Sequence, residues 1–118
     1  MSTLRAMGIA LVVTILGTPS FAKHFVVLGS GNTGCSSWTR ERNLAAGNWG
    51  GMGGWIDGYL SAVNEFVWPS ANISEGKSTD QLFSFVDKFC RMHPQNTVVD
   101  AAVALRDSLA LGATRNKR

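Results

Sequence analysis

Residues 78–90 read STDQLFSFVDKFC, and this stretch decides the fold class. Ser78 stands three residues before Gln81, which is the pattern of a helix capping box. The apolar residues that follow recur at three- and four-residue spacing and form one helical face: Leu82, Phe83, Val86, Phe89 and Cys90. Pro94 cannot continue a helix. The stretch therefore predicts an amphipathic helix that runs to about Met92 and carries a cysteine on its buried face.

The cysteine at the end of this helix has one possible partner, because Cys35 and Cys90 are the two cysteines of the chain. Positions 35 and 90 differ by 55 residues, and a disulfide that closes such a loop stabilises a fold by roughly 4 kcal/mol in the chain-entropy model. The pair lacks the C-x-x-C spacing, and neither cysteine has a neighbouring sequence signal for activation. We therefore expect a structural Cys35–Cys90 disulfide.

The first 22 residues have the three zones of a secretory signal peptide. Arg5 is the basic start, residues 6–17 are an apolar run, and residues 18–22 end in small residues at the first and third places of Ser20-Phe21-Ala22. A membrane span needs about 20 apolar residues, so this run is too short. The pattern predicts cleavage after Ala22, a periplasmic or secreted protein, and no stable membrane span after cleavage. An oxidising compartment also favours the disulfide.

A first helix is predicted over Cys35 to Ala46, with Thr33 as its N-cap. Cys35, Trp38 and Arg42 share one face, and Leu44 and Ala45 continue the apolar side.

A last helix is predicted after Thr97, which with Asp100 resembles a weaker cap. Its apolar stripe consists of Val98, Ala101, Ala102, Leu105 and Leu109. Gly112 is the expected C-terminal stop, and residues 113–118 are the expected disordered tail.

The second helix is predicted over Asn48 to Trp68 and has an unusual composition. Its apolar residues recur with helical period: Met52, Trp55, Ile56, Tyr59, Leu60, Val63, Phe66 and Val67. Small residues stand every four positions: Ala46, Gly50, Gly54, Gly58 and Ala62. A glycine inside a helix costs about 0.8–1 kcal/mol relative to alanine, so we expect another backbone to pack closely on this stripe. The competing interpretation is a glycine-rich loop over residues 47–54, with a helix that starts only near Trp55.

Together these elements predict an all-α fold, a small bundle of about four helices with one disulfide. Residues 23–112 would form a single helical domain after the signal peptide at residues 1–22. The disulfide would join the start of the first helix to the end of the third.

Several function classes find no support in the sequence. Residues 29–34 read GSGNTG and fit G-x-G-x-x-G, but no βαβ unit and no acidic partner follow, as a dinucleotide site would require. The chain after residue 22 has ten basic and eight acidic residues and no basic stripe with interleaved aromatics, so we expect no nucleic-acid partner.

The sequence also shows no recognisable catalytic motif. His24 and His93 do not stand in a metal-ligand spacing, and Asp57 and Glu65 are expected to be solvated carboxylates on one helix face. We therefore expect a protein that is not an enzyme, with no catalytic residue, no cofactor and no metal.

Several segments in order resemble the Rap/Tai immunity proteins, a group of small exported bacterial proteins, and more remotely the HdeA-type acid-stress chaperones. The segments are residues 31–38 with Arg40 and Arg42, residues 55–64, residues 82–90, Pro94, and residues 100–102. The resemblance covers nearly the whole chain after residue 22. It implies an all-α periplasmic fold with a single disulfide. Characterised Rap/Tai members bind and neutralise peptidoglycan amidase effectors delivered by type VI secretion.

The leading functional hypothesis is a small periplasmic binding protein of immunity or inhibitor type, with an effector or client protein as partner. Trp68, beside a turn-rich loop over residues 69–77, is the candidate partner-binding residue, and the alternative for it is ordinary core packing. One alternative is a periplasmic acid-stress chaperone of HdeA type. Another is a structural or interaction protein of unknown role. The sequence does not set the oligomeric state.

Overall fold

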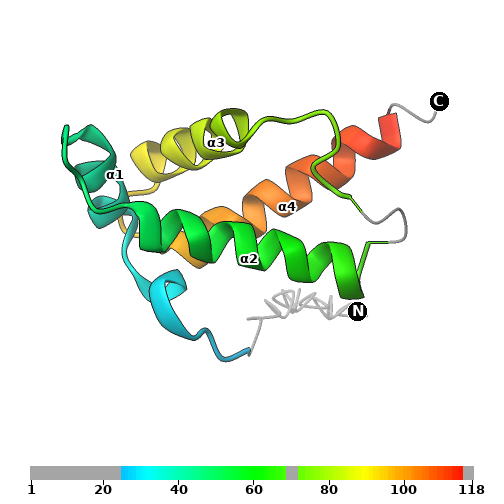
Figure 1. Ribbon diagram of the computed structural model, residues 1–118, viewed down its shortest axis with the longest axis horizontal. Coiled ribbons are helices and arrows are strands. Elements are labelled where there is room, and N and C mark those ends of the chain that lie inside the picture. Colours follow the sequence, from blue (N-terminus) through cyan, green and yellow to red (C-terminus); the bar gives the residue numbers. More distant parts are fainter. Residues whose placement is uncertain (1–24, 69–71, 116–118) are drawn as a thin grey trace, which may run out of the picture.

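The computed structural model describes residues 25–68 and 72–115, and these residues form a small all-α bundle with one disulfide (Figure 1). The elements are a short 3-10 helix η1 (Gly29–Asn32) and the α-helices α1 (Cys35–Asn43), α2 (Gly50–Phe66), α3 (Thr79–Met92) and α4 (Val98–Arg115). The predicted fold class is therefore confirmed. The predicted signal peptide, residues 1–22, lies outside the described residues.

The helices pack in an order that differs from their order in the chain: α1 lies on α3, α3 on α4, and α4 on α2. In Figure 1, α2 crosses in front of α4, and the C-terminal ends of both helices lie at the same end of the molecule. η1 packs on α2 and α4. The largest side chains that are fully buried between these elements are Trp38, Ile56, Val86 and Val98.

Two helix starts follow the sequence pattern closely. The Ser78 hydroxyl accepts the Gln81 backbone N–H at 3.2 Å, and the Gln81 side chain accepts the Ser78 backbone N–H at 2.9 Å, so the predicted capping box is present. At the start of α4, the Asp100 carboxylate accepts the Thr97 backbone N–H at 2.9 Å. The Thr97 hydroxyl in turn accepts the Asp100 N–H at 3.4 Å.

The end of α4 differs from the prediction. The helix continues through Gly112 to Arg115, and Gly112 does not take the positive φ of a helix-ending glycine. Of the predicted disordered tail, residues 113–115 are therefore helical, and residues 116–118 lie outside the described residues.

α1 is shorter than predicted at its C-terminal end. It ends at Asn43, because Leu44 adopts an extended backbone and the Glu41 side chain accepts the N–H of Asn48 at 2.9 Å, which turns the chain. Leu44 is consequently exposed instead of continuing the apolar face.

The predicted N-cap of α1 was also wrong. Gly34 occupies the N-cap position without a side-chain bond. The Thr33 carbonyl instead accepts the Val98 N–H at 2.8 Å, so this residue links η1 to the start of α4.

α2 begins at Gly50, which favours the long helix over the glycine-rich loop. The predicted close packing of the small-residue stripe is wrong, however. Gly50, Gly54 and Gly58 are exposed, and a Cβ built on any of them would meet no atom of the described residues within 4 Å. The close approach falls on Gly53, where a Cβ would lie 3.1 Å from the Phe83 ring.

The G-x-G-x-x-G segment forms η1 and supports an aromatic side chain. Gly31 is buried, and a Cβ there would clash with the indole of Trp55. That indole donates its Nε1–H to the Leu28 carbonyl at 2.7 Å. Gly29 has a φ of +71°, which glycine adopts at no steric cost. These glycines therefore serve local packing.

Candidate protein-binding groove

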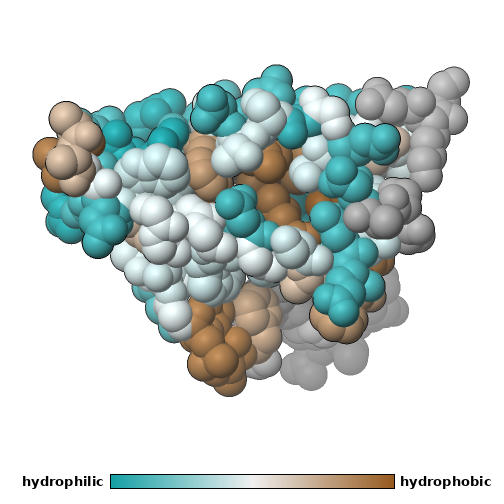
Figure 2. All heavy atoms as spheres, viewed as in Figure 1, coloured by the Kyte–Doolittle hydropathy of each residue, from teal (hydrophilic) through white to brown (hydrophobic). Residues whose placement is uncertain are grey.

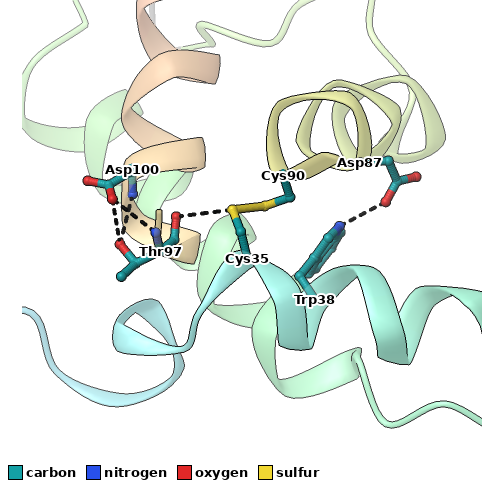
Figure 3. The surroundings of a disulfide bond; sticks show 6 residues. All are labelled: Cys35, Trp38, Asp87, Cys90, Thr97 and Asp100. Atoms are coloured by element: carbon teal, nitrogen blue, oxygen red, sulfur yellow. Dashed lines mark hydrogen bonds between the residues drawn. A yellow bond between two sulfur atoms is a disulfide. The ribbon is translucent and has the colours of Figure 1, made fainter. Parts of the chain in front are cut away.

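Three helix ends meet at the predicted disulfide (Figure 3). Cys35 at the start of α1 is bonded to Cys90 near the end of α3, with 4.8 Å between their Cα atoms, and both residues are buried. The start of α4 joins them through backbone bonds: the Cys35 N–H donates to the Asn96 carbonyl at 2.8 Å, and Gly34 forms an isolated bridge with Thr97. The disulfide therefore clamps one end of the bundle.

A polar and aromatic cluster extends this clamp along α1 and α3. The Trp38 indole donates to Asp87 Oδ1 at 2.8 Å, as Figure 3 shows. Arg42 donates to both oxygens of Asp87, from Nε at 3.0 Å and from Nη2 at 2.9 Å. The Arg42 guanidinium also lies 4.6 Å from the centre of the Trp49 ring, a distance typical of a cation–π contact. Trp38, Trp49 and Phe83 pack edge to face around it.

The ion pair shifts the titration of both partners. Burial acts to raise the pKa of Asp87, but the hydrogen bonds from Arg42 and Trp38 outweigh it, so the pKa of this carboxyl is lowered. The hydrogen bond to Asp87 raises the pKa of Arg42. Both groups therefore stay charged near neutral pH and hold α1 on α3.

The opposite end of the bundle carries a groove, and Trp68 lines it. The groove has a volume of about 670 Å³ and lies between Trp68, which follows α2, the segment 72–77 and the last turns of α4. Ile73, Leu109 and Gly112 supply apolar lining, and Glu75, Lys77 and Arg115 supply charge. Trp68 is half-buried and also packs against the core. It thus combines the two roles considered for it, core packing and a position beside an open surface.

Several residues that adjoin the groove lining in the sequence have exposed apolar side chains. Phe66 is 77% exposed and Val67 is 71% exposed, and both directly precede Trp68; Leu111 beside Gly112 is also exposed. We call Phe66, Val67 and Trp68 the groove mouth. The helical period predicts Phe66 and Val67 as part of the buried face of α2, but that face is buried only as far as Val63. No sequence signal marks this boundary.

A second exposed apolar segment is residues 25–28, which precede η1. Phe25, Val26 and Leu28 are exposed, and the segment forms the brown area in the lower part of Figure 2. It lies beside α4, where Phe25 and Val27 line a shallow depression with Val99 and Val103.

The carboxylates of Asp57 and Glu65 and the possible metal ligands are the other residues considered in the sequence. Asp57 and Glu65 are exposed on α2, and residues 25–68 and 72–115 contain no group of three His, Cys, Asp or Glu side chains that could hold a metal ion. None of the described helices is long and apolar enough to cross a bilayer.

Comparison of the chain with protein-family models, curated proteins and solved structures gives no match. The resemblance to Rap/Tai and HdeA-type proteins therefore stays a prediction.

Proposed function

We propose that this chain is an exported periplasmic binding protein of immunity type, which neutralises a peptidoglycan amidase by binding it at the groove mouth. The observation that carries the proposal is the exposure of Phe66 and Val67 beside the groove that Trp68 lines. Protein interfaces draw most of their binding energy from a few large apolar or aromatic side chains that fill pockets. Adjacent large apolar residues beside a concave surface are the kind of group that a partner covers.

The rigidity of the scaffold supports the same proposal. The Cys35–Cys90 disulfide and the Asp87 ion pair fix the end of the bundle that lies far from the groove, while Ile73 fastens the segment 72–77 to α2. The Ile73 N–H donates to the Asn64 side chain at 2.7 Å. A surface that is ordered before binding loses less conformational entropy on association. Inhibition by occlusion needs such a surface and no catalytic group.

The proposal is tested with the oxidised exported chain and an amidase encoded next to its gene. We expect hydrolysis of purified peptidoglycan to stop at an equimolar ratio, and co-expression in the periplasm to protect cells from the amidase. A genome without such an amidase, or full amidase activity at a large excess of this chain, would contradict the proposal.

A second candidate function, an acid-stress chaperone, is favoured by one observation. The Asp87 carboxylate holds α1 on α3 beside the aromatic cluster of Trp38, Trp49 and Phe83, and acid neutralises that carboxylate. If the cluster opens in acid, the chain should keep an aggregation-prone protein dispersed at about pH 2–3. Light scattering that rises equally with and without the chain at this pH would exclude this candidate.

A further inference from the structure

A small polar pocket lies between α1 and α3, on the face that carries the Asp87 ion pair. Its volume is about 170 Å³, and it is lined by Thr39, Arg42, Asn43, Asp87 and Arg91. The groove mouth contributes no residue to it, so its chemistry is separate from the site described above.

Hydrogen-bond donors outnumber the available acceptors in this pocket. Both oxygens of Asp87 are engaged, Oδ1 by Trp38 and Arg42 and Oδ2 by Arg42. Arg42 uses Nε and Nη2 for these bonds, and its Nη1 makes no hydrogen bond within the described part of the chain. Arg91 forms no ion pair with any described residue. The Thr39 hydroxyl oxygen is buried and has no hydrogen-bond partner among residues 25–68 and 72–115. Buried polar groups normally have one.

The charge of the lining selects the kind of acceptor. The lining holds two guanidinium groups and one carboxylate, so the residues of the pocket together carry one net positive charge. A monoanionic carboxylate would neutralise this positive charge. A dianion such as phosphate would add one negative charge more than the pocket neutralises, and that charge would repel the Asp87 carboxylate. Guanidinium groups match the planar geometry of carboxylates. Asp87 and the aromatic rings already hold Arg42 in place, so one partner of the pair is fixed before binding.

We propose that this pocket binds a carboxylate, with Arg42 Nη1 and the Arg91 guanidinium as the donors. The carboxylate can belong to a free small acid or to an Asp or Glu side chain of a bound protein. The proposal does not depend on the amidase as partner.

The test is an NMR titration of the oxidised chain with sodium acetate, with sodium chloride at equal ionic strength as the reference. We expect saturable shifts at the amides of Thr39, Asp87 and Arg91 that chloride does not reproduce. Arg91→Gln should weaken acetate binding roughly tenfold, the usual effect of losing one charge-assisted hydrogen bond. The matched control is Arg40→Gln, which removes the same charge from an exposed position where Arg40 contacts Glu41.

Two results would overturn the proposal. One is that Arg91→Gln and Arg40→Gln weaken acetate binding equally, which would indicate an effect of bulk charge. The other is that sodium chloride produces the same NMR shifts as sodium acetate. Tighter binding of inorganic phosphate at pH 8 than of acetate would overturn the choice of ligand class. A further titration with N-acetylglutamate amide separates the two sources. Binding at least as tight as that of acetate supports a protein side chain, and binding of acetate alone supports a free small acid.

Discussion

At the scale of single residues, Asp87 joins two helices that are far apart in the sequence. Its carboxylate accepts hydrogen bonds from Trp38 and Arg42, which lie 49 and 45 positions earlier. The sequence predicts that Trp38 and Arg42 share a face of the first helix, but it cannot identify their partner, because Asp87 stands among other charged residues on a helix whose orientation depends on packing.

Asp87→Asn should lower the free energy of unfolding at pH 7 by about 2 kcal/mol, the scale of hydrogen bonds that involve charged groups. The variant leaves the Arg42 guanidinium without its counter-charge. Urea unfolding followed by tryptophan fluorescence measures the loss. The exposed Asp57→Asn is the control, and an equal loss in both variants would contradict the role of Asp87.

The same ion pair predicts acid sensitivity. The pKa of Asp87 in the folded state is lowered from its ordinary value of 3.8. The ionised carboxylate therefore makes its full contribution to the free energy of unfolding at any pH above 3.8. This contribution is lost as the pH falls from 3.8 through the lowered pKa of the folded state. Between pH 5 and pH 2 the wild-type chain should therefore lose more stability than Asp87→Asn does. Parallel pH profiles for the two proteins would show that this carboxyl is not linked to folding.

At the scale of elements, the glycines of α2 divide into two groups with opposite roles. Gly53 is buried between the rings of Phe83 and Trp49, whereas Gly54 and Gly58 face open space. The long-helix interpretation of the sequence places them all in one helix, but it does not reveal which side of α2 meets the core. The regular stripe of small residues lies on the exposed side, so no backbone of the described residues packs on it to offset its helical cost.

Gly54→Ala and Gly58→Ala should each raise the free energy of unfolding by about 0.8–1 kcal/mol, because alanine favours the helix and meets no atom. Gly53→Ala, one position away, should lower it, since the added Cβ presses on two aromatic rings. Thermal unfolding of the three variants separates these cases. A stabilising Gly53→Ala, or a destabilising Gly54→Ala, would contradict the orientation of α2.

The helices themselves are predictable from the sequence, while some of their ends are not. The capping box at Ser78 is a local signal and places the start of α3 correctly. The end of α1 depends on the Glu41 side chain, which binds the Asn48 N–H, and glycine at position 112 is compatible with either a stop or a continued helix. The hydrophobic period of the sequence does not predict helix ends that depend on a side-chain contact or on packing.

At the scale of the whole molecule, the disulfide joins the start of α1 to the end of α3 at one corner, where backbone hydrogen bonds also attach the start of α4. The groove lies at the opposite end of the bundle. The disulfide follows from the cysteine count, but the groove forms only where Trp68 and the segment 72–77 lie against the last turns of α4, which no local pattern encodes. The sequence therefore predicts the scaffold and Trp68 as a candidate, and it misses Phe66 and Val67 as exposed residues.

Replacing both cysteines by alanine should lower the free energy of unfolding by up to about 4 kcal/mol, because the unfolded chain gains the freedom of an open loop. The loop spans 55 positions. Denaturant unfolding of the double variant against the oxidised wild type measures the difference, and dithiothreitol treatment of the wild type should reproduce it. A double variant as stable as the wild type would show that the packing of α1 on α3 needs no covalent link.

The central claim is that the groove mouth binds the partner protein, and isothermal titration of the cognate amidase with variants of this chain tests it most directly. Phe66→Asp places a charge on an exposed side chain with little effect on the fold, and Met92→Asp makes the same kind of change at an exposed position near the disulfide end. We predict that Phe66→Asp weakens binding at least about thirtyfold, the scale of a hot-spot loss, while Met92→Asp binds as the wild type does. Equal affinities for wild type, Phe66→Asp and Met92→Asp would contradict the claim.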